Sequence, residues 1–178
     1  LPLRDAGIGA SVVTHALSGE PGFFMLMITP PAAEREITIP RDVTLILDTS
    51  GSGGKIAQAR DALDQILGSL TGDDRFRLIT FNSVVREFRQ GFADADPATV
   101  RAAREFLAGV RADGSTNVAD ALRTALEPEA TEDRLSLIVF LTDGKPTVGE
   151  TSPEAIAEMA RRIRDRERVF AFGVGHDV

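Results

Sequence analysis

The chain has 178 residues, of which 43% are hydrophobic, so it is long enough to build the core of one domain of ordinary size. Its net charge of -7 and its lack of Trp and Tyr argue against a nucleic-acid partner, and its lack of Cys excludes disulfides and any Cys-based metal site. No apolar run reaches the roughly 18 residues that a membrane-spanning helix needs, so we expect no membrane insertion by this fragment.

The first 41 residues differ in pattern from the rest. Two short apolar runs, Ser11–Leu17 and Gly22–Thr29, flank a Ser-Gly-Glu-Pro cluster that favours a turn. Prolines then oppose regular structure between residues 30 and 40. The pattern predicts an N-terminal β-hairpin and a Pro-containing connector over residues 1–41, followed by a separate domain over residues 42–178.

The apolar run Val43–Leu47 predicts a central strand that is buried on both faces of a parallel sheet. It ends in the oxygen-bearing residues Asp48, Ser50 and Ser52, and Gly51 permits a turn that lets these alternate side chains converge. Ligands of open α/β sheets bind outside the carboxyl ends of the strands. Oxygen donors without His or Cys suit Mg²⁺, Mn²⁺ or Ca²⁺ rather than zinc.

Helical and extended patterns alternate after this strand. Apolar residues recur at helical spacing over residues 56–70. Two strands, Arg77–Phe81 and Val84–Phe88, flank a tight Asn-Ser turn, which predicts an antiparallel edge strand. An Asp-Pro pair at residues 96–97 supplies the N-cap and first position of the next helix.

A polar loop at residues 113–117 leads into another helix. Leu135–Leu141 is a second fully apolar strand, and like the first it stops at an acidic turn, Thr142-Asp143-Gly144. A helix begins at Ser152-Pro153 and continues to about Glu167, and Val169–Val174 predicts a third buried strand. Strands that alternate with helices predict an α/β fold with a doubly wound, mostly parallel open sheet.

Five oxygen-bearing residues share one ordered pattern: Asp48-x-Ser50-x-Ser52, Thr116 and Asp143. Over residues 42–178 this pattern resembles the metal-ion-dependent adhesion site (MIDAS) of von Willebrand factor type A domains. The resemblance implies that the three hydroxyls bind a divalent cation and that the two aspartates act directly or through water. It also implies that a carboxylate of a partner protein completes the octahedron, and that Gly51, Asn117 and Gly144 shape the rim.

Flanking segments are similar to the inter-alpha-trypsin inhibitor heavy chains and to their bacterial envelope or secreted relatives. They are Gly22–Pro31, Pro40–Val43, Asp74–Phe76, Phe81–Ser83, Phe140–Gly144 and Phe172–Gly175. This resemblance implies an extracytoplasmic location, in the cell envelope or outside the cell. The start at Leu1 indicates a fragment or a processed chain, so we expect any targeting segment to lie outside it.

The chain departs from the family pattern in three places. Gly53-Gly54 leads straight to Lys55, which shortens the loop beside the expected metal site. Ser115 stands where a glycine is common, and the chain stops at Val178, before the last strand and helix with which the family normally continues.

Other interpretations of the same residues are weaker. Either aspartate alone is well explained as a turn former or a helix cap, but five oxygen donors in order favour a metal site. The Gly51–Lys55 segment fails the phosphate-loop pattern, because Thr49 stands where its first Gly belongs and Ile56 follows the Lys. A dinucleotide-binding fingerprint fails as well, since Ile56 occupies its third Gly position.

An enzyme is the alternative of a different class. Magnesium phosphohydrolases that use an aspartate nucleophile need a second Asp two residues on, where this chain has Ser50. Ser52 as a hydrolase nucleophile lacks the glycine that the pattern needs at position 50, and His15 and His176 are the only histidine bases. The sequence thus favours a non-enzymatic, cation-dependent protein-binding or adhesion module. Its alternatives are a phosphohydrolase-like enzyme and an intracellular A domain that assembles with an ATPase.

Overall fold

The computed structural model describes residues 9–15, 23–29, 39–51, 56–128, 131–142 and 144–173. The chain forms two compact units, Leu1–Thr38 and Ile39–Val178. The first contains a two-stranded antiparallel sheet of β1 (Gly9–His15) and β2 (Phe23–Thr29), as the hairpin pattern predicts. The predicted turn between them, the connector at residues 30–38 and the short Gly53-Gly54 loop lie outside the described residues.

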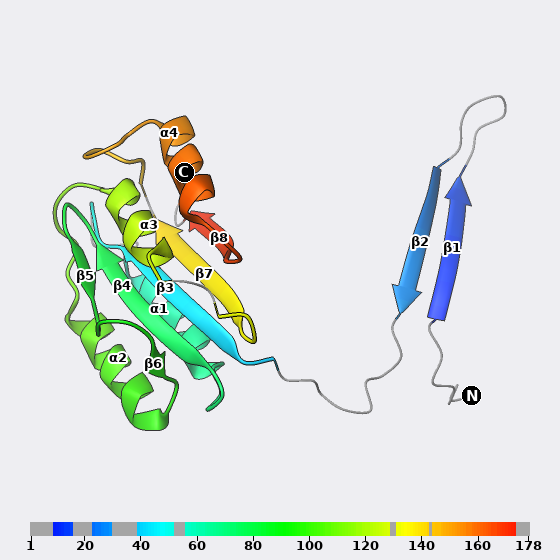
Figure 1. Cartoon of the computed structure of the whole chain (residues 1–178), viewed down its shortest axis with the longest axis horizontal. Coiled ribbons are helices and arrows are strands. Elements are labelled where there is room, and N and C mark those ends of the chain that lie inside the picture. Colours follow the sequence, from blue (N-terminus) through cyan, green and yellow to red (C-terminus); the bar gives the residue numbers. More distant parts are fainter. Residues whose placement is uncertain are drawn as a thin grey trace. The chain divides into compact units, whose positions relative to one another are not determined.

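The second unit is built on a six-stranded sheet in the order β5-β4-β3-β7-β8, with β6 paired to the start of β4 (Figure 1). Its strands are β3 (Arg41–Asp48), β4 (Arg75–Phe81), β5 (Val85–Glu87), β6 (Ala93–Asp94), β7 (Leu135–Thr142) and β8 (Arg168–Gly173). The strands β3, β4, β7 and β8 are parallel, whereas β5 and β6 run antiparallel to β4. The predicted mostly parallel α/β sheet is therefore confirmed, and β6 is an addition too short to show a sequence period.

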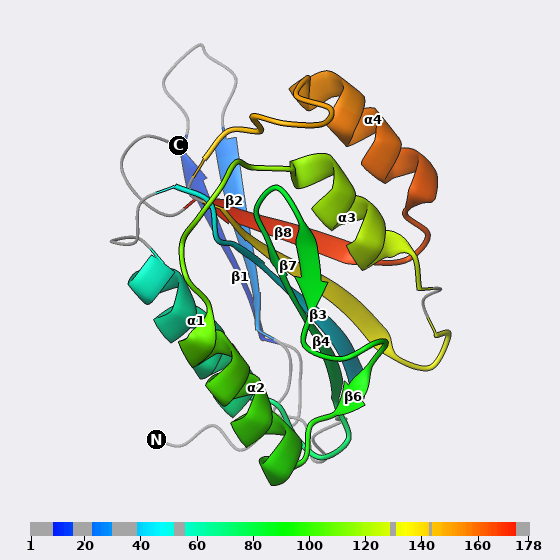
Figure 2. The same ribbon diagram turned by 90° about the vertical axis from the view of Figure 1, so that its left-hand side faces the viewer.

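Helices cover both faces of this sheet, with α1 and α2 on one side and α3 and α4 on the other (Figure 2). Their bounds are α1 (Ile56–Gly68), α2 (Pro97–Gly109), α3 (Val118–Leu126) and α4 (Pro153–Ile163). Leu45 and Leu47 of β3 belong to the apolar cluster beneath α1 and α2, and Ile46 belongs to the one beneath α3. Coverage of both faces of β3 explains why its middle, Val43–Leu47, is mostly apolar and carries no charged residue.

The helix starts agree with the sequence signals, but one helix end does not. The carboxylate of Asp96 accepts hydrogen bonds from the backbone N–H groups of Ala98 and Thr99, and Ser152 caps α4 in a similar way. The expected extension of α4 to Glu167 is wrong, because the backbone is already extended at Arg164. Glu167 instead accepts a hydrogen bond from the backbone N–H of Asp165 in the loop that leads to β8.

The expectation that β8 is a buried strand is also wrong. Phe170 and Phe172 are 47% and 52% exposed. β8 is the last strand in the order of the sheet, and no other described strand pairs with its outer edge. An apolar run can predict a strand, but it cannot show that a helix covers each face of that strand. No helix in the described part of the chain is long and apolar enough to cross a membrane.

Candidate metal centre

The candidate site begins with Asp48, the last residue of the central strand β3. Leu47 pairs with Leu141 of β7, so Asp48 and Thr142 are the next residues of the two strands and lie at the same end of the sheet. The Thr142 hydroxyl donates to Asp48 Oδ2 at 2.7 Å, and the backbone N–H of Ser50 donates to Asp48 Oδ1 at 2.9 Å. These two bonds fix the orientation of the carboxylate of Asp48, a residue that is only 6% exposed.

Two buried hydroxyls meet beside this carboxylate. Ser50 Oγ and Thr116 Oγ1 are 2.6 Å apart, although the residues are 66 positions apart in the chain. Gly51 follows with a φ of 75°, so the turn after β3 uses the left-handed conformation that glycine adopts without strain. One proton joins the two hydroxyl oxygens, and each oxygen keeps lone-pair capacity for a further ligand.

The loop that carries Thr116 is held from two sides. The backbone N–H of Thr147 donates to the Thr116 carbonyl at 2.9 Å, and the Thr116 N–H donates to the Thr147 hydroxyl at 2.8 Å. On the other side, the backbone N–H of Asn117 donates to the Asn82 carbonyl at 2.9 Å. The position of the Thr116 hydroxyl is therefore set by backbone contacts with the loops that follow β4 and β7.

Asp48 also stands out for its electrostatic surroundings. No Lys, Arg or His in the described residues forms an ion pair with it. Nor does any group of three or more His, Asp or Glu gather as a metal cluster within the described ranges. The donors that meet here are one carboxylate and two hydroxyls, and such hard oxygen ligands fit a divalent cation of the Mg²⁺ or Ca²⁺ type.

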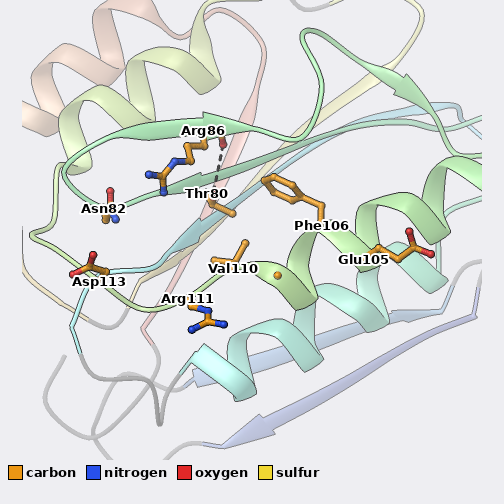
Figure 3. Close-up of a pocket in the computed structure, with 9 residues that line it drawn as sticks. Thr80, Asn82, Arg86, Glu105, Phe106, Val110, Arg111 and Asp113 are labelled. Atoms are coloured by element: carbon orange, nitrogen blue, oxygen red, sulfur yellow. Dashed lines mark hydrogen bonds between the residues drawn. The ribbon is translucent and has the colours of Figure 1, made fainter.

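The two flanks of this site differ in chemistry. On the β4 side, a pocket of about 540 Å³ has a mixed lining of charged, polar and apolar residues: Thr80, Asn82, Arg86, Glu105, Phe106, Gly109, Val110, Arg111 and Asp113 (Figure 3). It is linked to the site through the backbone N–H of Asp113, which donates to the Thr49 carbonyl at 2.8 Å. On the β7 side, an apolar groove of about 360 Å³ lies between α3 and α4, and Thr142 and Gly144 are part of its lining.

The predicted site residues have different outcomes. Asp48, Ser50 and Thr116 lie together, whereas Ser52 and Asp143 lie outside the described residues. Of the expected rim residues, Gly51 forms the turn after β3 and Gly144 lies beside the Thr116 hydroxyl, which would be 3.7 Å from a Cβ built on that glycine. Asn117 is the N-cap of α3, with its side-chain oxygen accepting from the backbone N–H of Asp120 at 3.3 Å.

The sequence pattern did not point to two contributing residues: Thr142, which orients Asp48, and Thr147, which holds the Thr116 backbone. A signal for Thr142 was present, because it is the first polar residue after the apolar run of β7, as Asp48 is after that of β3. Thr147 has no such signal, since its role depends on how the loop after β7 folds back.

Residues 41–178 match the family model described as the von Willebrand factor type A domain. The chain is 40% identical over 182 residues to human inter-alpha-trypsin inhibitor heavy chain H4, covering 93% of this chain and 19% of that protein. It is 32% identical over 168 residues to heavy chain H2 of Mus musculus, covering 88% of this chain and 17% of the relative. The chain thus spans about a fifth of the length of these curated relatives.

Solved structures share the fold at lower identity. A von Willebrand factor type A protein from Catenulispora acidiphila has a TM-score of 0.67 at 21% identity, covering 96% of this chain and 38% of the other. Proximal thread matrix protein 1 from the mussel byssus, described with a zinc-occupied MIDAS motif, has a TM-score of 0.60 at 17% identity, covering 78% of this chain and 39% of that one. The chain therefore belongs to the von Willebrand factor type A domain family, and its sequence resembles the inter-alpha-trypsin inhibitor heavy chains.

Proposed function

We propose that this domain is a protein–protein interaction module that depends on a divalent cation. The proposed ligands are the hydroxyls of Ser50, Ser52 and Thr116, with Asp48 and Asp143 acting directly or through water. The observation that carries the proposal is the pair of hydroxyls 2.6 Å apart beside the buried Asp48, which has no ion-pair partner among the described residues. The mussel byssus structure with zinc in its MIDAS motif is consistent with a divalent ion in this fold.

The donor chemistry explains why an acidic partner would bind. Neutral hydroxyls and few carboxylates leave much of the charge of a cation uncompensated. A bound cation would supply positive charge that attracts an Asp or Glu side chain of a partner protein. In this arrangement Thr142 holds Asp48 in position through its hydroxyl, and Thr147 holds the backbone of Thr116.

We infer a binding role rather than a catalytic one. Where a magnesium phosphohydrolase has its second carboxylate, this chain has Ser50, and the hydroxyl of Ser50 contacts Thr116. We expect no magnesium-dependent hydrolysis of generic phosphate and ester substrates. Turnover that Ser50→Ala abolishes would overturn the binding role.

We also infer an extracytoplasmic location, in the cell envelope or outside the cell. Fractionation of the cells that make the full-length protein tests this inference. A cytosolic protein that co-purifies with an ATPase would instead support the intracellular alternative.

Calorimetric titration of the metal-stripped 178-residue chain with Mg²⁺, Mn²⁺ and Ca²⁺ tests the proposed site. Two substitutions at Thr116 make the test specific. Thr116→Val keeps the side-chain shape but removes the hydroxyl, so we expect cation affinity to fall by about tenfold or more, while Thr116→Ser keeps the hydroxyl and stays within about threefold. Circular dichroism confirms that both variants are folded, since the chain has no Trp or Tyr for fluorescence. Equal affinity of the Val and Ser variants would contradict the assignment of Thr116 as a ligand.

A further inference from the structure

The apolar groove between α3 and α4 lies next to the candidate metal centre. Its floor is formed by Phe140 of β7 with Val169 and Ala171 of β8, and its walls by apolar residues of α3 and α4. The residues of the walls are Val118, Leu122, Ile156, Ala157 and Ala160. At about 360 Å³ the groove is large enough for a Leu or Phe side chain, because pockets that hold small ligands start at roughly 300 Å³.

The groove and the candidate site share a wall. Thr142 and Gly144 line the groove, and the Thr142 hydroxyl is the group that donates to Asp48 Oδ2 at 2.7 Å. The Thr142 hydroxyl oxygen also accepts a hydrogen bond from the Gly144 N–H at 3.3 Å and lies 3.0 Å from the Gly144 carbonyl oxygen. The groove therefore begins at the residues that orient the Asp48 carboxylate.

The opposite flank has a different character. The pocket in Figure 3 presents the charged side chains of Arg86, Glu105, Arg111 and Asp113 around Phe106 and Val110. An apolar side chain that entered this pocket would displace water from charged groups at a cost, whereas in the α3–α4 groove it would bury apolar surface at a gain. The β7 side, whose groove is lined almost entirely by apolar residues, is thus the more favourable flank for an apolar contact.

A carboxylate that binds at the site brings the rest of its chain with it. Consecutive Cα atoms are 3.8 Å apart, so residues one or two positions from the acidic residue stay within about 8 Å of it and are the ones that can reach the immediate flanks of the site. We propose that the α3–α4 groove is the second half of the binding surface. It takes a Leu, Ile, Met or Phe side chain of the partner protein that stands within two residues of the acidic residue. This inference rests on the proposed cation-dependent function.

The test is a selection from a phage-displayed peptide library with one fixed Asp and randomised flanking residues, on the 178-residue chain in Mg²⁺. We expect recovered peptides to carry a large apolar residue within two positions of the Asp and to be released by EDTA. Replacing that residue by Ser in a synthetic peptide should weaken binding about tenfold or more, as expected for the loss of a buried large apolar side chain.

Variants in which the α3–α4 groove is filled test whether this groove binds the apolar side chain of the partner. Ala157 and Ala160 are half-buried on α4, and Leu at either position fills the groove while preserving helix propensity. We expect Ala157→Leu and Ala160→Leu to bind Mg²⁺ as the parent does but to lose the preference for an apolar neighbour. Ala108→Leu, at an exposed position of α2 on the other face of the sheet, is the matched control and should leave the preference unchanged.

The outcomes separate this inference from the proposed function. If calorimetry shows no Mg²⁺ binding by the parent chain, the proposed function fails before any peptide is tested. If Mg²⁺ binds but selection yields no EDTA-sensitive peptide, or peptides without an apolar neighbour, the groove assignment is overturned while the metal site stands. A dimer in sedimentation that Ala157→Leu disrupts, without any peptide preference, would assign the groove to self-association and equally overturn the inference.

Discussion

The two ends of the parallel sheet carry buried carboxylates in opposite surroundings. At the end where the strands begin, Asp42 contacts both Arg75 and Arg134 at 2.6 Å, and Asp74 contacts Arg41 at 2.6 Å. At the end where the strands finish, Asp48 has a hydroxyl and a backbone N–H as its partners, with no guanidinium among the described residues. Arginines already compensate the charge of the first set of carboxylates, Asp42 and Asp74, whereas the charge of Asp48 can be compensated by a cation.

The acid–base behaviour of the first set reflects this pairing. Burial alone raises the pKa of Asp74, but hydrogen bonds from Arg41 and Thr71 outweigh it and hold the pKa well below its usual range. Burial likewise opposes the effect of Arg75 and Arg134 on Asp42, and the pKa of Asp42 is lowered overall. We infer that carboxylates where the strands begin hold β3, β4 and β7 together, and that Asp48 is kept for binding.

The largest effect on stability is expected where the strands begin. Asp42→Asn leaves Arg75 and Arg134 without their common carboxylate, and loss of one member of a buried ion pair costs about 3 kcal/mol, at the low end of the usual range because Arg75 is partly exposed. Urea unfolding followed by circular dichroism measures this change. Asp61→Asn, on the exposed face of α1, is the matched control and should change stability by less than about 0.5 kcal/mol.

The same variant separates the two ends of the sheet. Asp42 and Asp48 are the second and last residues of β3, so about 20 Å of extended strand divides them. Cation affinity of folded Asp42→Asn protein should therefore equal that of the parent. A large loss of affinity would show that the two ends are coupled and would weaken the division between structural and binding carboxylates.

Asp48→Asn should produce the reverse pattern. The amide keeps the size of the side chain and an acceptor for the Ser50 N–H, so we expect the metal-free protein to change in stability by less than about 1 kcal/mol. Loss of the charge should lower cation affinity by at least about 100-fold in calorimetric titration. A variant that is strongly destabilised yet still binds Mg²⁺ would assign Asp48 to the structural class instead.

Backbone geometry, rather than ion pairing, holds the loops around the candidate site. Gly149 has a φ of 70°, and a Cβ at this position would lie 2.7 Å from the side-chain oxygen of Asn117, the cap of α3. Gly149→Ala should lower stability by about 2 kcal/mol, from the left-handed conformation and the displaced cap together. Gly91→Ala is the control. Gly91 has a φ of 75° with open space around it, so an Ala there is destabilising through its backbone conformation alone. Equal losses in thermal or urea unfolding would show that Asn117 moves aside freely.

The smallest expected effect is the loss of folding stability in acid, which is absent near neutral pH. The folded-state pKa values of Asp42 and Asp74 are lowered, so their stabilisation is fully present above the unfolded-state value of about 4 and is lost as the pH falls through that value toward the folded-state one. The free energy of unfolding in EDTA should be flat above about pH 5 and decline below it. Asp42→Asn should decline less steeply than the parent. Identical slopes would show that Asp42 is not part of the acid response.

Local pattern was sufficient for most of the scaffold and for part of the site. Apolar runs that end in polar residues identified β3 and β7, and Asp96 and Ser152 marked two helix starts. Thr142 follows the same pattern, as the first polar residue after an apolar run. It was not predicted as a site residue, because the neighbouring Asp143 is the more obvious cation ligand. The end of α4 was placed too late, since alternating charges after Ile163 fit a solvated helix as well as a loop.

Partners that are distant in the chain could not be predicted from pattern. The ion pairs of Asp42 depend on the register of β3 against β4, where Asp42 lies opposite Arg75, and on the approach of Arg134 just before β7. The exposure of Phe170 and Phe172 depends on which strand is last in the sheet and on how far the helices extend over it.

The amino-acid sequence by itself determined the α/β class, the order of the elements and the carboxylate at the end of β3. These follow from the spacing of apolar residues and from the polar residues that end each apolar run, which are near one another in the chain. Tertiary structure alone brought Ser50 and Thr116 to 2.6 Å and gave Asp42 its two arginines while giving Asp48 neutral partners. The physical reason is that strand order and register decide which distant groups meet in the buried, low-dielectric surroundings at the ends of the strands. No local pattern encodes that choice.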